Sequence, residues 1–191
     1  GALVRDANDG RLLMLSNNHV LANSASGRDQ RAKAGDNILQ PGKHDGGKNP
    51  ADVIGYLERF VPLERPTVRS ACGKAQLMES ALNRLVSAIK PQYTVEFQRS
   101  SPGDNLVDAA VARPVNDKAL SRRILGLGAV QGIAEAYPGQ KIIYSGRSSG
   151  INSGKVVATD VSIYVTMDAG DQVLFTEQII TSAVSRPGDS G

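Results

Sequence analysis

The sequence predicts an all-β protein, because three features of the chain are typical of sheets joined by tight turns. Apolar runs are short and alternate with clusters of turn residues. Glycine is frequent, with 20 residues, as expected for many turns. The hydrophobic fraction of 40% contains no tryptophan, so the core must consist mostly of Val, Leu, Ile and Ala. A chain of 191 residues is long enough for one large domain or two small ones.

The strands follow from the apolar runs and the turn residues between them. A hairpin is expected over residues 2–15, because two apolar runs flank an Asn-Asp-Gly turn. The second run leads directly to His19. Further strands are expected at 37–42, 53–62, 93–97, 106–112, 141–145, 155–159, 161–166 and 173–181.

One segment, 74–90, departs from the strand pattern. Its apolar residues recur at steps of three and four, which predicts an amphipathic helix that Pro91 ends. We expect an inserted helix, at about 73–90, that packs on the N-terminal half of the protein. Binding a partner or gating the site is the alternative. The repeating residues are Leu77, Met78, Ala81, Leu82, Leu85, Ala88 and Ile89.

Charge and hydropathy exclude two classes of partner. The 22 basic residues exceed the 19 acidic ones by only +3, and they are scattered without interleaved aromatic residues. Nucleic-acid binding is therefore not expected. No apolar run approaches the ~18 residues that a membrane helix needs, so no membrane partner is expected either.

The cysteine count bears on the compartment. Cys72 is the single cysteine, so no intramolecular disulfide can form. This pattern indicates a reducing compartment or a bacterial protein that does not depend on disulfides. With no signal peptide visible, a cytoplasmic location is favoured and bacterial export is left open. A nucleophilic role for Cys72 is not expected, because no histidine lies near it in the sequence.

The candidate nucleophile is Ser190, in the Pro-Gly-Asp-Ser-Gly segment at 187–191. A serine between glycines fits a tight turn that exposes a hydroxyl and aims backbone N–H groups at an oxyanion. All these residue types also favour ordinary turns, so the motif alone leaves a purely structural turn open.

A serine hydroxyl needs a base, and histidine has the ordinary pKa for that task. His19 is preferred to His44, the other histidine, which lies in a polar Gly-rich loop. Asp108, among apolar residues, is preferred to Asp104 as the partner of the imidazole, because Asp104 is in a turn-like Pro-Gly-Asp-Asn context. An Asp that caps a strand end remains the alternative. His44 and Asp45 offer too few ligands for a metal site.

The order His19, Asp108, Ser190 and the local contexts of these residues resemble the trypsin- and chymotrypsin-like serine peptidases. The Ser-Asn-Asn-His-Val-Leu string at 16–21 is most similar to bacterial and plant branches, the Deg-type and narrow-leaf-type proteases. A further similarity is the Gly-Arg-Ser-Ser-Gly turn at 146–150, between two apolar runs.

The resemblance implies two chymotrypsin-like six-stranded barrels with the site in the cleft between them. The N-terminal barrel would cover 1–115, including the helical insertion, and the C-terminal barrel 116–191. Because strands after the nucleophile complete the second barrel in that family, this barrel is expected to be incomplete at its C-terminus. The mature protein is therefore expected to continue beyond Gly191.

The resemblance also implies roles for the site residues. Ser190 would be the nucleophile, His19 the general base and Asp108 the group that orients His19. The N–H groups of Gly188 and Ser190 would form the oxyanion hole. Val184, six residues before Ser190, would form the floor of the substrate pocket. A preference for small or apolar residues, and not for Arg or Lys, follows from that valine.

The expected function is that of a serine endopeptidase with a peptide or protein substrate and no cofactor. The alternative is a catalytically silent member of the fold that serves as a peptide-binding or assembly module. A homo-oligomer is compatible with either. A serine esterase of another fold is disfavoured by the order of the three residues and by the lack of a Gly-x-Ser-x-Gly elbow.

Overall fold

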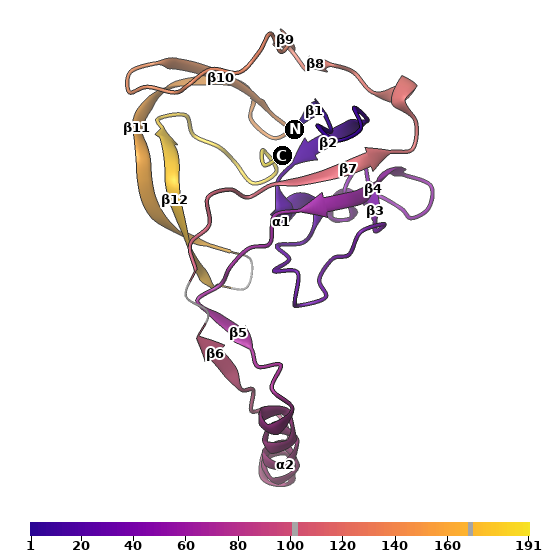
Figure 1. Ribbon diagram of the computed structural model, residues 1–191, viewed down its shortest axis with the longest axis vertical. Coiled ribbons are helices and arrows are strands. Elements are labelled where there is room, and N and C mark those ends of the chain that lie inside the picture. Colours follow the sequence, from indigo (N-terminus) through magenta and orange to yellow (C-terminus); the bar gives the residue numbers. More distant parts are fainter. Residues whose placement is uncertain (101–102, 168–169) are drawn as a thin grey trace.

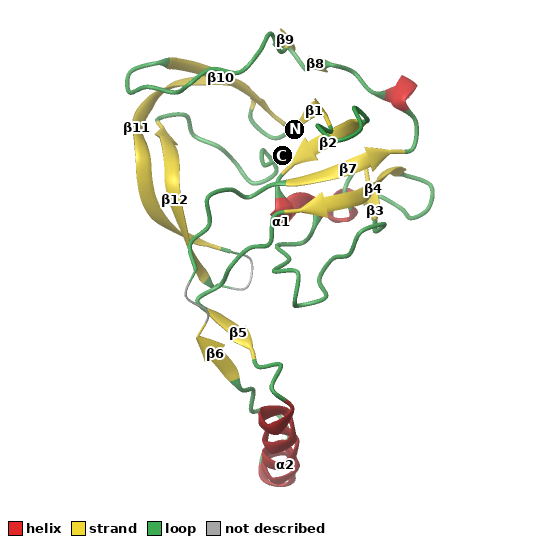
Figure 2. Ribbon diagram, in the orientation of Figure 1, coloured by secondary structure: helices red, strands yellow, loops and turns green. Residues whose placement is uncertain are grey.

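The computed structural model describes residues 1–100, 103–167 and 170–191. Two lobes built on sheets lie side by side, and an arm that ends in a helix projects from one end of them (Figure 1). Strands dominate and helices are few, so the predicted β character of the chain is confirmed (Figure 2).

The first lobe is a five-stranded antiparallel sheet in the order β1-β2-β7-β4-β3. The predicted hairpin is confirmed, since Ala2 pairs with Leu15 and Arg5 with Leu12. The core of this lobe is aliphatic and small-residue, with Leu57 as its largest fully buried member. The strands are β1 (Ala2–Arg5), β2 (Leu12–Ser16), β3 (Asn37–Leu39), β4 (Val53–Phe60) and β7 (Ala110–Pro114).

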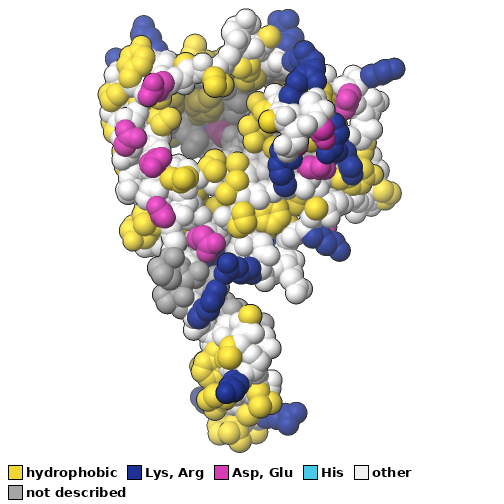
Figure 3. Space-filling model, viewed as in Figure 1, with side chains coloured by type: hydrophobic (Ala, Val, Ile, Leu, Met, Phe, Trp, Pro, Cys, Tyr) yellow, Lys and Arg dark blue, Asp and Glu magenta, His cyan; other side chains and the backbone are white. Residues whose placement is uncertain are grey.

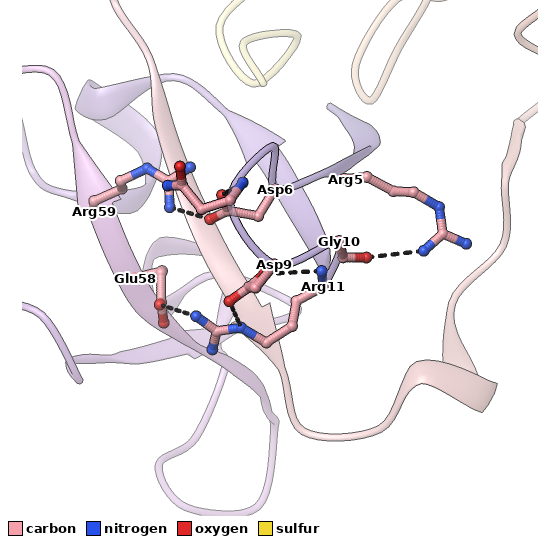
Figure 4. Close-up of polar contacts among 8 residues, drawn as sticks. Arg5, Asp6, Asp9, Gly10, Arg11, Glu58 and Arg59 are labelled. Carbon is pink, nitrogen blue, oxygen red and sulfur yellow. Dashed lines mark hydrogen bonds and ion pairs between the residues drawn. The ribbon is translucent and has the colours of Figure 1, made fainter.

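Charged side chains fasten the β1–β2 turn to β4 (Figure 4). Arg11 bridges two acids, with Nε 2.5 Å from Asp9 Oδ2 and Nη2 3.2 Å from Glu58 Oε1. Arg59 Nη1 donates to the buried Asp6 carboxylate at 2.6 Å. This cluster holds the β1–β2 hairpin against the sheet at the end away from His19.

The second lobe is a three-stranded sheet in the order β10-β11-β12. Its strands are β10 (Lys141–Gly146), β11 (Gly150–Thr166) and β12 (Gln172–Thr181). The expectation of separate strands at 155–159 and 161–166 is wrong, because β11 runs through both. Its register against β12 shifts repeatedly between Val156 and Ile163, and Asp160 has φ 56°. These irregularities bend the strand without ending it.

Short elements complete the lobes. Among the described residues, the two large sheets have five and three strands and the other two have two strands each, so the six-stranded barrels and the boundary after residue 115 stay predictions. Among the same residues, no helix is long and apolar enough to cross a bilayer. The short elements are α1 (Asn18–Leu21), η1 (Lys43–Asp45), η2 (Asp117–Ala119), β8 (Arg123–Ile124) and β9 (Gly128–Ala129).

Asn105 joins the two lobes just before β7. It forms an isolated parallel bridge with Phe175 of β12. Its buried side chain donates to the carbonyls of Glu64 and Leu174, each at 3.0 Å, and accepts from Glu64 N at 2.8 Å. The chain therefore crosses from the edge of the second sheet into the first sheet at this residue.

The arm consists of a two-stranded ribbon, β5 (Thr67–Arg69) and β6 (Gln98–Ser100), and the helix α2 (Gly73–Ile89). α2 lies within one residue of the range expected at each end, and its status as an insertion stays a prediction. The expectation that the helix packs on the N-terminal half is wrong. α2 stands away from both lobes (Figure 1), and the apolar side chains on it are exposed (Figure 3).

The segment that follows α2 explains this outcome. The strand expected at 93–97 is wrong: this stretch is irregular and returns along the helix. Hydrogen bonds with Asn83 and Glu79 hold it there. The helix therefore has a partner within the arm, which the amphipathic pattern of the sequence could not show.

Candidate active site

His19 lies in α1, directly after β2, and the two asparagines before it fix its position. Asn18 is fully buried; its Nδ2 donates to Ala25 O at 2.9 Å and to Val61 O at 2.7 Å. Asn17 Nδ2 donates to Asp108 O at 3.0 Å. The Asn-Asn-His string therefore connects the helical turn to the loops around it and to the backbone of the predicted acid.

Asp108 contacts His19 through both carboxylate oxygens. Oδ2 forms a short hydrogen bond with His19 Nδ1, and Oδ1 accepts from His19 N at 3.1 Å. With Nδ1 in this hydrogen bond, Nε2 is the ring nitrogen that would accept a proton from a substrate or a nucleophile. The predicted pair of acid and base is thus in contact.

The environment keeps Asp108 ionised. Burial is the largest single influence and acts to raise the pKa of the Asp108 carboxyl. The hydrogen bond and charge of His19, with the N–H groups of His19 and Asn18, together outweigh it, so that the pKa lies below its ordinary value. An ionised Asp108 favours a proton on Nδ1 and stabilises the imidazolium when it forms.

The expected buried strand at 106–112 is wrong in its first half. β7 begins at Ala110, and both Leu106 and Val107 are exposed. Asp108 therefore lies in the connection that leads from Asn105 into β7, and not within a strand. Backbone bonding of this connection to β12 replaces the apolar burial that the sequence suggested.

Ser190 follows a turn that Asp189 fastens to the β10–β11 hairpin. Asp189 Oδ1 accepts from Ser148 N at 2.8 Å and from Ser149 N at 2.9 Å. Its Oδ2 accepts from Ser149 Oγ at 2.5 Å and from Arg186 N at 2.7 Å. The residue beside the predicted nucleophile is therefore held by the Gly-Arg-Ser-Ser-Gly turn that the sequence singled out.

These contacts favour the ionised form of the Asp189 carboxylate. The hydroxyl of Ser149 and the backbone N–H groups of Arg186, Ser149 and Ser148 hold the pKa of Asp189 far below its usual range. Ser148 Oγ also donates to Pro187 O at 2.7 Å. Hydrogen bonds therefore fix the turn on both sides, directly before Ser190.

Gly188 has the backbone conformation that the predicted oxyanion turn requires. Its φ is +95°, and a Cβ there would lie 2.6 Å from Ser148 Oγ and 2.7 Å from Arg147 Nη1. The left-handed conformation favours glycine, whereas the two atoms that a Cβ would approach are the ends of side chains that can shift. The role of the Gly188 and Ser190 N–H groups toward an oxyanion stays a prediction.

The end of the chain lies against the strand that leads to His19. Gly191 O accepts a hydrogen bond from Gly1 N, and a Cβ on Gly191 would lie 2.9 Å from Ser16 Oγ. Ser16 is three residues before His19, and Ser190 itself is exposed. The serine motif and the histidine motif, far apart in the sequence, are thus neighbours in the fold. A hydrogen bond between Ser190 Oγ and His19 stays a prediction.

The backbone at Val184, the predicted pocket residue, is fixed by β10 and β11. Tyr144 Oη donates to Val184 O at 2.5 Å, and Asn152 Nδ2 donates to the same oxygen at 3.1 Å. The Val184 side chain is 73% exposed. It is therefore available to a ligand, on a segment that cannot easily move.

The competing candidates have other surroundings. His44 is exposed in η1, and its neighbour Asp45 pairs at 2.5 Å with Nη2 of Arg147, which belongs to the turn that binds Asp189. Asp104 accepts from Thr176 Oγ1 at 2.9 Å, so it connects the lobes. Cys72 is exposed before α2, and hydrogen bonds from backbone N–H groups lower the pKa of its thiol. Within the described ranges, no three potential ligands group closely enough to hold a metal ion.

Four supporting residues have no predicted role in the sequence motifs that contain them. Asn17 and Asn18 belong to the histidine motif, and Asn18 is wholly buried. Ser148 and Ser149 belong to the predicted hairpin turn, and both bind Asp189. Two adjacent asparagines before a histidine, and two serines in a glycine-bounded turn, are the signals in the sequence that point to these contacts.

Comparison with known proteins shows a partial likeness among solved structures. No protein-family model matches the chain, and no curated protein matches it significantly. A crystal structure of Cellulomonas bogoriensis chymotrypsin is similar to the chain at 28% identity with a TM-score of 0.33. The match covers 53% of this chain and 54% of that chain, so it spans about half the length of each.

Proposed function

We propose that this protein is a serine endopeptidase that hydrolyses peptide bonds through Ser190, His19 and Asp108. The single observation that carries the proposal is the bidentate contact of Asp108 with His19, at Nδ1 and at the backbone N. An aspartate that binds only Nδ1 is common for structural histidines. One that also binds the backbone of the same residue fixes both the tautomer and the ring orientation, as a general base requires.

The chemistry is an acyl transfer in two halves. Ser190 Oγ forms a bond to the substrate carbonyl carbon while its proton passes to His19 Nε2. The C–N bond then breaks as His19 gives that proton to the leaving amine, which leaves an ester on Ser190. Water adds to the ester with His19 again as the base, and the acid product leaves with the Ser190 hydroxyl restored.

The turn at 186–189 supports the developing negative charge. The N–H groups of Gly188 and Ser190 are the donors for the carbonyl oxygen in the tetrahedral intermediate. Preorganised donors of this kind are worth about 10²–10³ in turnover each. Asp189 contributes by holding the turn on Ser148 and Ser149, so it is a positioning residue and not an acid in the reaction.

The proposed specificity is for small or apolar residues before the scissile bond, with Val184 at the floor of the pocket. No carboxylate is proposed there to pair with Arg or Lys. A peptide library screened by mass spectrometry measures this preference. Cleavage confined to Arg or Lys sites would overturn the specificity and leave the peptidase assignment intact.

Because of the Ser-Asn-Asn-His motif, we also propose that the protein belongs to the Deg-type or narrow-leaf-type branch.

The test is labelling with a fluorophosphonate probe, which reacts with activated serines. The chain, its longest natural form, Ser190→Ala and a matched control, Ser185→Ala, are compared by gel fluorescence. An activated Ser190 gives labelling that only Ser190→Ala abolishes, and turnover on a cleaved peptide falls by about 10⁶. Ser185 is exposed on the same segment, so its variant reports any general disturbance.

Three outcomes are distinguishable. Labelling in the longer form alone means that residues after Gly191 complete the site. Labelling that survives Ser190→Ala contradicts the assignment of the nucleophile. No labelling in any form, with peptide binding retained, supports the alternative of a catalytically silent binding or assembly module, for which the exposed face of α2 offers a surface.

A further inference from the structure

Four large apolar side chains form an exposed row along α2. Met78, Leu82, Leu85 and Ile89 are 57%, 38%, 65% and 80% exposed. They are spaced by 4, 3 and 4 residues, which is the a/d pattern of a helix that faces another helix. We call these four residues the α2 seam.

A neighbouring face of α2, rotated by about 100° from the seam, already has a partner within the chain. Asn83 Nδ2 donates to Val95 O at 2.9 Å, and Val95 N donates back to Asn83 Oδ1 at 2.7 Å. Phe97 N donates to the buried Glu79 at 3.3 Å. These bonds fix the rotation of the helix about its axis, so the α2 seam lies beside the face that the return segment covers and stays exposed.

The arm places the α2 seam where a large partner can reach it. The β5–β6 ribbon carries α2 clear of both lobes, and apolar side chains cover much of its surface (Figures 1 and 3). Ala81 and Ala88 flank the seam with small side chains, which permits close approach of a second helix backbone.

We propose that the α2 seam binds the α2 seam of a second copy of this chain, with the two helices antiparallel. The charges favour this direction. α2 has no acid in its first turn and carries Lys74 there, at the positive end of its own dipole. An antiparallel partner places its negative C-terminal end beside Lys74. A parallel partner would instead bring the two Lys74 side chains together.

The composition of α2 favours a helix over a lipid surface as the occupant. Interfacial helices have a strongly charged face opposite the apolar one. The 17 residues of α2 carry three charges, Lys74, Glu79 and Arg84, of which Glu79 is buried against the return segment. Four side chains along about 16 Å of helix make a contact smaller than a standard interface, so the dimer is expected to be weak and concentration-dependent.

Analytical ultracentrifugation of the whole chain tests the pairing. The weight-average mass of the wild type is expected to rise from monomer toward dimer with concentration. Leu85→Glu, at the centre of the α2 seam, is expected to stay monomeric. Leu125→Glu is the matched control, since Leu125 is 86% exposed outside the arm, and it is expected to behave as the wild type. Circular dichroism confirms that each variant is folded.

Cross-linking tests the direction. Cys72 is the sole cysteine, directly before α2. In an antiparallel pair centred on the α2 seam, each Cys72 lies about 11 residues from the centre, so the two thiols are roughly 35 Å apart and a short bismaleimide does not join them. Leu82→Cys in a Cys72→Ser background lies near the centre and is joined. Efficient joining through Cys72 would overturn the antiparallel arrangement.

Other results overturn the pairing itself. A wild type that remains monomeric up to about 1 mM excludes a meaningful self-association. A dimer that Leu85→Glu leaves intact assigns the contact to another surface. Monomer that floats with phosphatidylcholine–phosphatidylglycerol vesicles, and loses this in Leu85→Glu, assigns the seam to a lipid surface. None of these results depends on whether Ser190 is catalytic.

Discussion

The two lobes achieve order by different means. The first lobe buries a continuous apolar cluster that includes Ile38 and Leu57, on a sheet of five strands. The second lobe has a smaller cluster, Val173 and Phe175 with Leu63, which comes from the connection before the arm. Many of its aliphatic residues are exposed, among them Ile143 at 61%.

Polar contacts replace the missing apolar burial in the second lobe. Asn105 bonds its β12 edge to the first lobe, and Arg65 Nη1 donates to Asp171 Oδ2 at 2.5 Å. Asp189 ties the Ser190 turn to the β10–β11 hairpin. The first lobe is therefore held together by its own apolar core, whereas a few directional hydrogen bonds and ion pairs position the second lobe. The candidate site uses one element of each kind.

The largest expected effect is in the first core. Leu57→Ala removes a side chain that is 1% exposed, so we expect a loss of about 2–5 kcal/mol in unfolding free energy. Ile143→Ala, in the second lobe, is expected to cost less than about 0.5 kcal/mol. Urea titration measures both. Equal losses would mean that Ile143 is buried and that the two lobes are alike.

Asn105→Ala is expected to separate the lobes at a cost of about 3 kcal/mol. It leaves both the carbonyl and the N–H of the partly buried Glu64 without their side-chain partner and removes one of the two donors to Leu174 O, and an unsatisfied buried group costs about 1–3 kcal/mol. Gln178→Ala is the control, because Gln178 makes an exposed bond to Leu106 O. Limited proteolysis near residue 105 should accelerate in Asn105→Ala alone. An unchanged cleavage rate would contradict the bridging role.

Asp189 gives a pH-dependent contribution of known sign. Because its pKa is lower in the folded than in the unfolded chain, the unfolded chain binds more protons between the two values. Stability from Asp189 is therefore present above the ordinary carboxyl pKa of about 4, and it declines as the pH falls below that. Asp189→Asn should flatten this decline, and Ser149→Ala should flatten it partly. Parallel curves for wild type and Asp189→Asn would contradict the anchoring.

The smallest expected effect is at Asp45. Its pair with Arg147 is on the surface, with side chains 34% and 60% exposed, and such pairs contribute about 0–1 kcal/mol. Asp45→Asn should therefore change the unfolding free energy by less than about 1 kcal/mol, and added salt should remove the difference. A larger, salt-insensitive loss would place this contact among the bonds that hold the second lobe.

What the sequence could predict was local. The 2–15 hairpin and the 74–90 helix depend on neighbouring residues, and the structure has both. The continuity of β11 could not be predicted, because Asp160 at φ 56° and the register shifts are tolerated only when β12 supplies the pairing. The partners of Asp189 are about 40 residues away in the chain, so only the fold reveals them.

The His19–Asp108 contact could be predicted from the motifs because the resemblance supplied their order. The surroundings of this contact could not be predicted. Leu106 and Val107 suggested a buried strand, yet they are exposed, since this connection satisfies its backbone on β12. The apolar stripe on α2 likewise indicated burial. The direction in which it faces depends on the hydrogen bonds of Asn83 and Glu79 with the return segment.

The β5–β6 ribbon has a consequence for how the chain could be rebuilt. Thr67 lies opposite Ser100 across the ribbon, so the arm leaves the body and returns to it at a single point. Replacing such a segment by a short turn leaves the ends where they were and changes the entropy of chain closure only slightly. The arm can therefore be removed, or exchanged for another segment whose two ends lie equally close together, while both lobes keep their connections.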